Sequence, residues 1–346
     1  MLFLTLHTFQ SKGGIETFNQ YFIHALIKNK FIFYSISLHD KKDASINHQH
    51  KSCKGSYVKF LWNIIKYSKQ SKIIIWGHIN LLPLFILFYP LFKNKRNILI
   101  IHGIDVWNPL FRTKLKFNGV KKIDEVWSVS HYTKKKFVEN YSFPFEKIHV
   151  FPNTIQPKPF QNPNPYNFNQ IKILSILRLQ SKEKVLSVLR VIDVLPEILK
   201  KHEVQFYIIG DGKYKTQLVQ HVYLKGLEKN VFLLGYVDNT APYLEHCDIF
   251  TLVSDTEGFG IVLLEAMQFA KPCIAAKNTG SEDVVITGES GFLVNPDDDF
   301  DLYQKLLLLI ENKELRIKMG EKGKEIFKST FTFEHFCEKQ KQLLLF

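Results

Sequence analysis

The chain has 346 residues, 45% of them hydrophobic, and this length suits two domains better than a single core. Its net charge of +13 lies in the first half, because residues 1–170 hold 24 Lys and Arg against 8 Asp and Glu, whereas the remainder holds 22 against 25. No recognition module or aromatic-basic repeat accompanies this charge, so the composition argues against a nucleic-acid partner.

The first residues, MLFLTLHTF, predict a strand and not a secretory signal, because they lack a basic region and their apolar run is short. The most membrane-like run, Ile79–Phe92, is too short to span a bilayer and contains two prolines. We expect it to form a buried helix, with an interfacial segment as the alternative. The four cysteines show no paired spacing, which favours a reduced, cytoplasmic protein.

A basic stretch in the first half has no acidic residue from Ala44 to Ile104. Such a surface attracts anionic lipid headgroups or phosphorylated acceptors, and an ordinary solvated basic face is the plain alternative. Contact with an anionic membrane surface predicts binding to anionic vesicles that weakens as salt is added.

In chain order, the first half alternates apolar runs with amphipathic stretches. Strands are expected at residues 2–7, 31–38, 72–78, 97–103, 125–130 and 147–151, with helices between them. This order predicts a parallel doubly wound sheet, whose ligands bind at the carboxyl ends of the strands.

Two features lie at such strand ends. Gly13 and Gly14 precede a helix starting near Ile15 and would allow backbone to approach a phosphate or sugar, although a GG turn is common before helices. His102 ends the strand ILIIH and could bind a transferred sugar or position an acceptor hydroxyl, although a lone histidine is more often structural. His48 and His50 are expected in a loop without fitting metal ligands.

Residues 152–170 are rich in proline and asparagine, which is typical of a linker. A second α/β alternation follows, with strands expected at 172–177, 205–209, 231–236 and 248–254. We therefore expect a first domain at 1–155, a linker at 156–170, a second domain at 171–330 and a terminal helix at 331–346.

The centre of the second half reads Glu257-Gly-Phe-Gly-Ile-Val-Leu-Leu-Glu265, a glycine turn between a buried strand and an apolar helix. Amides at the start of a helix can hold a phosphate, and Gly258 and Gly260 permit close approach. The two carboxylates lie about 10 Å apart at a rise of about 1.5 Å per residue. Taken singly, each glutamate could be a helix cap or a core acid paired with a local lysine.

EGFGIVLLE resembles the E-x7-E motif of retaining glycosyltransferases of family 4, also called glycosyl transferases group 1. The flanking CDIFTLVSDT and AKPCIAAKNTGSEDVVITGESGFLVNPDD resemble the same family, over about fifty positions in all. The resemblance implies a GT-B fold, with two Rossmann-like doubly wound domains facing a central cleft, and a terminal helix that crosses back to the first domain.

Through this resemblance, Arg178 and Lys184 are expected to neutralise the diphosphate of a nucleotide-sugar donor, together with the amides near Gly258, Phe259 and Gly260. The family's lysine-glycine pair is missing, so Lys182 remains an alternative to Lys184. Gly210 is expected beside the nucleotide. Glu265 would hold the ribose and Glu257 would contact the donor sugar, with His102 opposite; no metal or other cofactor is implied.

The resemblance implies transfer of a sugar to a hydroxyl of a glycan or lipid-linked glycan, as in cell-surface polysaccharide synthesis. The resemblance also implies attack on the face that the leaving phosphate departs from, with the leaving oxygen taking the acceptor proton. The alternatives are a sugar-nucleotide epimerase of the same architecture and a degenerate nucleotide-binding module. The protein is expected to be cytoplasmic, in peripheral contact with the inner face of the membrane.

Overall fold

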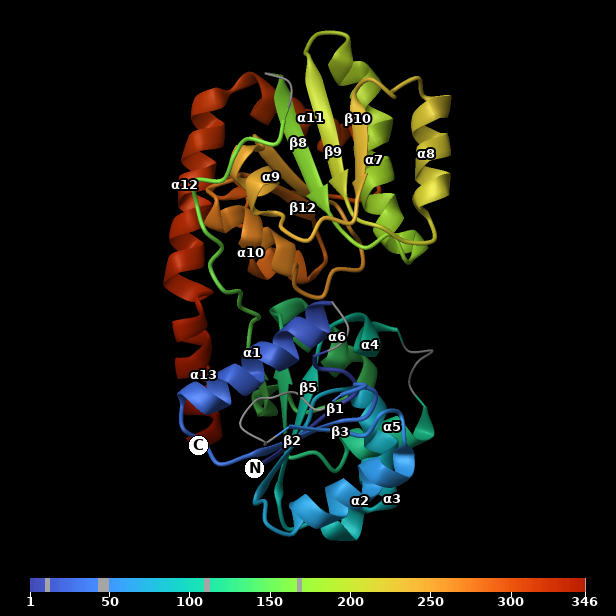
Figure 1. Ribbon diagram of the computed structural model, residues 1–346, viewed down its shortest axis with the longest axis vertical. Helices are drawn as coiled ribbons and strands as arrows, with labels where there is room; N and C mark the ends of the chain where they lie inside the picture. Colours follow the sequence, from blue (N-terminus) through green and yellow to red (C-terminus); the bar gives the residue numbers. More distant parts are fainter. Residues whose placement is uncertain (10–12, 43–49, 109–112, 167–169, 346) are drawn as a thin grey trace. The chain divides into compact units, whose positions relative to one another are not determined.

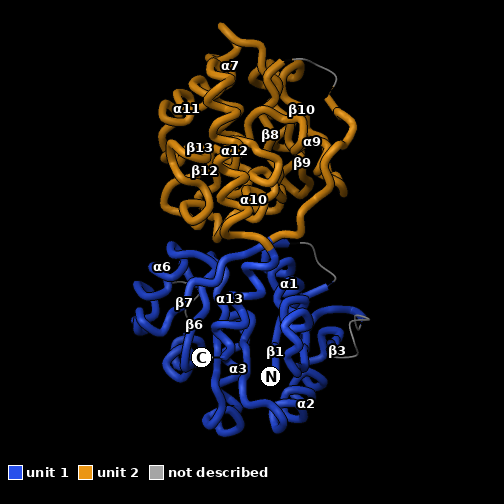
Figure 2. Tube along the Cα trace, turned by 90° about the vertical axis from the view of Figure 1, so that its left-hand side faces the viewer, with its two compact units in different colours: residues 1–154, 333–346 blue, residues 155–332 orange. Residues whose placement is uncertain are grey.

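The computed structural model describes residues 1–9, 13–42, 50–108, 113–166 and 170–345, and they form two compact units (Figures 1 and 2). The first unit comprises Met1–Thr154 and Phe333–Phe346, and the second comprises Ile155–Thr332. The chain therefore enters the second unit once and returns to the first for its last helix.

The described residues of the first unit form a seven-stranded parallel sheet with strand order β3-β2-β1-β4-β5-β6-β7. Its strands are β1 (Leu2–Thr5), β2 (Tyr34–Ser37), β3 (His50–Ser52), β4 (Ile73–Trp76), β5 (Arg96–Ile101), β6 (Glu125–Ser128) and β7 (Ile148–Val150). Helices cover both faces: α1 (Gly14–Lys28), α2 (Tyr57–Ser68), α3 (Leu82–Leu87), α4 (Ile104–Trp107), α5 (Lys114–Val120), α6 (His131–Tyr141) and α13 (Phe333–Leu345).

The described residues of the second unit form a six-stranded parallel sheet with strand order β10-β9-β8-β11-β12-β13. Its strands are β8 (Ile171–Ile176), β9 (Val204–Ile209), β10 (Val231–Gly235), β11 (Ile249–Leu252), β12 (Cys273–Ala276) and β13 (Gly291–Val294). Its helices are α7 (Lys182–Leu199), α8 (Lys215–Leu224), α9 (Ala241–His246), α10 (Ile261–Gln268), α11 (Asp299–Glu311) and α12 (Lys313–Thr330). The prediction of two doubly wound parallel sheets is confirmed.

The central strands are buried on both faces, which explains why their sequences are continuous apolar runs and not alternating ones. Leu2–Leu4 and Ile98–Ile101 are fully buried in the first unit, as are Ile173 and Leu174 in the second. All four cysteines are buried free thiols. The core of each unit is thus fixed by patterns that are visible in the sequence.

Helix α13 belongs to the first unit and lies against α1 (Figure 1). The Gln340 side-chain amide donates to the Phe22 carbonyl at 2.9 Å, and Asn29 donates to the Cys337 carbonyl at 2.8 Å. Gln340 is fully buried, so this amide–carbonyl contact fixes the position of the helix on the unit.

Two expectations need correction. The run Ile79–Phe92 is not one buried helix, since it breaks into the 3-10 turns η1 (Ile79–Leu81) and η2 (Tyr89–Leu91) around the short α3, and Leu87 is 70% exposed. Its prolines begin α3 and η2, where a missing N–H is tolerated. His50 does not lie in a loop, because it begins β3; His48 lies outside the described residues. No described helix is both long enough and apolar enough to cross a bilayer.

Candidate active site

Glu257 lies in the turn between β11 and α10, where its carboxylate has close partners. The Lys184 ammonium is 2.6 Å from Oε2, and the Gly260 amide donates to Oε1 at 3.0 Å. Gly260 precedes α10 with φ of 91°, a backbone conformation that favours glycine. The Glu257 side chain is 18% exposed, so its carboxylate remains within reach of a ligand.

The 3-10 helix η5 (Gly280–Asp283) packs against this turn and fixes its backbone. The Gly280 amide donates to the Glu257 carbonyl at 2.7 Å, and a Cβ at Gly280 would lie 1.9 Å from the Gly258 carbonyl oxygen. Phe259 is buried, with its ring edge-on to Phe331. Phe259 therefore acts as an anchor, and any contribution of this residue to donor binding would come from its backbone.

Glu265 lies about one turn into α10 and also pairs with a lysine. The Lys158 ammonium is 2.6 Å from Glu265 Oε2, and Lys158 also donates to Thr240 Oγ1 at 2.5 Å. Thr240 Oγ1 lies 3.4 Å from the same carboxylate oxygen. Each predicted glutamate of the second unit thus carries its own ammonium partner.

Sequence reasoning missed Lys158, which falls in the stretch interpreted as a linker. In the structure residues 158–162 contact helices α9 and α10 of the second unit: the Lys158 backbone exchanges hydrogen bonds with the Gln268 side chain at 3.0 and 2.6 Å. The Glu245 carboxylate accepts the amides of Gln161 and Asn162, both at 2.8 Å. Lys158 is the one charged residue in the sequence from 152 to 170. This single charge is the sequence feature that could have marked Lys158 as a candidate site residue.

The two candidate diphosphate lysines differ in position. Lys182 is exposed at the first turn of α7, whereas Lys184 is half-buried and directed at Glu257. Arg178 is exposed, two residues beyond the end of β8. The geometry brings Lys184, and not Lys182, against the glycine turn.

Gly210 follows β9 and is required by packing. A Cβ there would lie 1.8 Å from the Leu177 carbonyl oxygen, and the φ of 154° is strained for other residues. Gly212 is similarly close to the Leu179 carbonyl. These glycines let the ends of β8 and β9 approach each other, and this close approach is sufficient to explain them without a ligand.

In the first unit, His102 follows β5 and is buried. Its Nε2 lies 2.9 Å from the Gly77 carbonyl; because a carbonyl only accepts, Nε2 carries the proton. Burial lowers the pKa of His102 to about 4, so the ring is neutral at pH 7. Its Nδ1 then has a lone pair that can accept a hydrogen bond from a hydroxyl group.

His102 has polar neighbours on both sides. The Asp105 carboxylate accepts the His102 amide at 3.3 Å, and burial raises the pKa of Asp105 to about 7. The His78 ring stacks with its centroid 6.3 Å from that of His102, and burial lowers the pKa of His78 to about 3. The two imidazole rings are therefore neutral at pH 7, and neutral rings suit hydroxyls better than anions.

Gly13 caps the start of α1 with an extended φ of −176°, a conformation open to any residue, and Gly14 is exposed in the first turn. Asp40, also missed by sequence reasoning, lies after β2 and fixes the segment that follows β1. Its carboxylate accepts hydrogen bonds from the amides of Thr8 at 3.1 Å and Phe9 at 3.2 Å. Burial alone would raise the pKa of Asp40, but hydrogen bonds from His50 and these amides outweigh it and lower the pKa to about 2.

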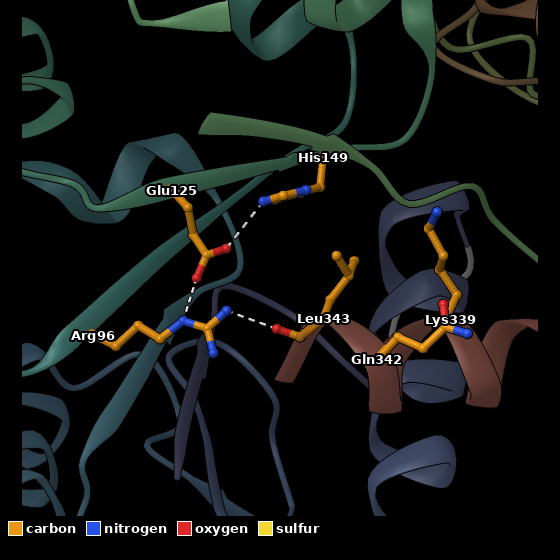
Figure 3. Close-up of a pocket in the computed structure, with 6 residues that line it drawn as sticks. All are labelled: Arg96, Glu125, His149, Lys339, Gln342 and Leu343. Atoms are coloured by element: carbon orange, nitrogen blue, oxygen red, sulfur yellow. Dashed lines mark hydrogen bonds and ion pairs between the residues drawn. The ribbon is translucent and has the colours of Figure 1, made fainter. Parts of the chain in front are cut away.

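No group of three or more potential metal ligands occurs in the part of the chain that the structure describes. A pocket of about 450 Å³ in the first unit lies where β5 and β6 begin, at the sheet edge opposite to His102 (Figure 3). In it the Arg96 guanidinium pairs with Glu125 and donates to the carbonyls of Leu343 and Leu344 at the end of α13. None of the predicted site residues lines this pocket. The hydrogen bonds from Arg96 hold the end of the terminal helix α13 against the first unit.

Two doubly wound parallel sheets of this kind define the GT-B class of glycosyltransferases, and solved structures agree. The Anabaena protein HepE in complex with UDP and glucose superposes with a TM-score of 0.79 over 99% of both chains, at 19% identity. At this identity the likeness shows the fold alone.

The glycosyl transferases group 1 model matches residues 159–326. The chain is 31% identical over 255 residues to an uncharacterized glycosyltransferase of Methanocaldococcus jannaschii, covering 70% of this chain and 67% of that protein. The chain therefore belongs to the glycosyl transferases group 1 family and is a glycosyltransferase.

Two further relatives have more specific names. The chain is 27% identical over 248 residues to N-acetyl-alpha-D-glucosaminyl L-malate synthase of Bacillus anthracis, covering 68% of this chain and 63% of that protein. It is 29% identical over 177 residues to poly(ribitol-phosphate) alpha-N-acetylglucosaminyltransferase of Staphylococcus aureus, covering 51% and 36%. Both matches span less than two thirds of those proteins.

Proposed function

We propose that this glycosyltransferase moves a sugar, with retention of configuration, from a nucleotide-sugar to a hydroxyl of a glycan or lipid-linked glycan in cell-surface polysaccharide synthesis. The observation that carries the proposal is the pair of lysine–glutamate contacts at the turn and helix of the Glu257–Glu265 motif. Each ammonium is paired with a carboxylate, and in our proposal both ammonium groups, with the amides at the start of α10, would donate hydrogen bonds to a bound donor.

In this proposal the second unit binds the donor. Lys184 and Arg178 stabilise the charge that develops on the leaving diphosphate, assisted by the amides of Gly258 and Gly260. Glu257, held by Lys184 and the Gly260 amide, orients the donor sugar. Glu265 accepts hydrogen bonds from the nucleotide ribose, and Lys158 fixes the orientation of its carboxylate.

The first unit binds the acceptor. His102 holds a hydroxyl of the acceptor or of the transferred sugar through the lone pair on Nδ1, while Gly13 and Gly14 allow a substrate to approach the start of α1. The leaving phosphate oxygen takes the acceptor proton, and no metal is required in this scheme. The name of the relative that acts on poly(ribitol-phosphate) supports a polymeric, phosphate-bearing acceptor, which the basic first half would attract.

We also propose that the protein works in the cytoplasm at the inner face of an anionic membrane, where a lipid-linked acceptor would be presented. The basic first half of the sequence supports this location.

A nucleotide screen by thermal shift and calorimetry tests the donor site, beginning with UDP because the HepE complex contains it. Glu265→Gln should weaken binding of the stabilising nucleotide by about 10- to 100-fold, because it removes hydrogen bonds to a charged acceptor. Glu289→Gln, an exposed change in the same unit, is the matched control and should bind normally. Equal affinity for both variants would place the ribose elsewhere.

Turnover then distinguishes the function classes. Transfer from the nucleotide-sugar to a glycan acceptor, with the anomeric configuration of the product read by NMR, is the expected result. Donor isomerisation without an acceptor would identify an epimerase. Tight nucleotide binding without either reaction would identify a non-catalytic binding module.

A further inference from the structure

Helix α2 carries apolar side chains on two opposite faces. Phe60 and Ile64 are buried in the core of the first unit. Val58, Trp62 and Ile65 are 79%, 61% and 36% exposed. Their spacing of four and then three residues places them in one stripe on the solvent side of the helix. A large exposed apolar stripe of this kind is not explained by packing and marks an interaction surface.

The same helix is bordered by positive charge. Lys59, Lys66 and Lys69 are exposed in or directly after α2, and α2 contains no acidic residue. The Lys66 ammonium lies 5.0 Å from the centre of the Trp62 ring. This is a cation–π contact, which the exposed ammonium makes with the ring face. The solvent face of α2 is thus apolar along its centre and basic at its border.

We propose that α2 docks the protein on an anionic lipid bilayer, lying in the interface with Trp62 at the level of the headgroups. An amphipathic helix with a tryptophan on its apolar face and lysines beside it has the chemistry of interfacial helices. The lysines supply attraction to anionic lipids, and the stripe supplies apolar area. This docking surface deepens the membrane location proposed above, and the lipid-linked acceptor rests on the proposed function; vesicle binding itself is measured independently of sugar transfer.

Helix α8 of the second unit shows that exposed apolar side chains alone do not make such a surface. Its Val219, Tyr223 and Leu224 are 50%, 71% and 80% exposed. Helix α8 has an acidic partner: Asp193 lies 2.9 Å from His221 on this helix and 2.8 Å from Lys225 just after it. This charge neutralisation makes α8 a matched comparison for α2.

Flotation with vesicles of equal parts phosphatidylglycerol and phosphatidylcholine tests the proposal. The full chain should bind these vesicles at low salt, bind weakly to pure phosphatidylcholine, and dissociate as salt is added. Binding should also shift tryptophan emission to shorter wavelength. Trp76 and Trp127 are already fully buried and Trp107 is half-buried on α4, so the change is expected from Trp62. Trp62→Phe should keep the binding and lose the shift.

Two pairs of variants locate the surface. Lys66→Glu with Lys69→Glu should lower partitioning by at least about 25-fold, since one basic residue near an anionic surface contributes about a factor of five. The same double change at Lys313 and Lys318, exposed on α12, should have a much smaller effect. Trp62→Glu should abolish binding, and Tyr223→Glu on α8 should not.

Equal losses in the α2 variants and their controls, or vesicle binding without a change in Trp62 emission, would overturn the proposal. Transfer to a water-soluble acceptor, measured in parallel, should be retained in the α2 variants. Absence of transfer in the unmodified protein, alongside normal vesicle binding, would instead count against the proposed function and leave the docking surface standing.

Discussion

Replacing Lys158 by Met removes the ammonium that neutralises Glu265 and keeps most of the apolar volume of the side chain. The Lys158 Nζ lies 2.6 Å from Glu265 Oε2, and the two side chains are 27% and 18% exposed. Exposed pairs contribute about 0.2–1 kcal/mol, whereas removing one partner of a fully buried pair costs about 3–5 kcal/mol. This half-buried pair lies between those limits, so we expect Lys158→Met to lower the free energy of unfolding by about 2 kcal/mol.

A double-mutant cycle with Glu265→Gln, followed by urea denaturation, isolates the interaction itself. The expected coupling is about 1–2 kcal/mol, because the double variant leaves no unpaired charge. Lys313→Met, an exposed change in the same unit, is the control and should alter stability by less than about 0.5 kcal/mol. If Lys158→Met were as mild as this control, or if the two site changes were additive, the pairing argument would be refuted.

Three further predictions follow from single contacts. Gly210→Ala should destabilise the second unit by more than about 3 kcal/mol, read by urea denaturation, because the new Cβ would lie 1.8 Å from the Leu177 carbonyl oxygen; a milder loss would mean that the strands can separate. The folded-state pKa of His102, about 4, is below its unfolded value, so the stability that His102 contributes is complete above about pH 6.5 and is lost as pH falls toward 4. His102→Asn should reduce this acid sensitivity and lower transfer by at least about 10-fold, and an unchanged stability–pH profile would contradict the assignment. Arg96→Met should destabilise the first unit by about 3 kcal/mol and expose α13 to proteolysis, because Arg96 holds the last carbonyls of that helix (Figure 3); resistance equal to that of the unmodified protein would contradict this role.

Local sequence determined most of the fold. The strands β1, β5, β8 and β11 could be recognised from hydrophobic patterning alone. A strand that is buried on both faces has a continuous apolar sequence, and each of these strands has one. The glycine turn before α10 was also visible, since Gly260 adopts a left-handed φ that few other residues tolerate. Short elements such as β3 could not be recognised from the sequence. Strand β3 begins at the buried His50, which pairs with the buried Asp40 of another segment of the chain.

Only the tertiary structure decided which charges meet. The partners of Glu265 and Glu257 are Lys158 and Lys184, which lie 107 and 73 residues away in the sequence, and no local pattern specifies such pairs. The sequence indicated that these carboxylates would need counter-charges, because a half-buried carboxylate is costly alone. The choice among the available lysines depended on where the extended segment after Thr154 and the first turn of α7 come to lie on the second sheet.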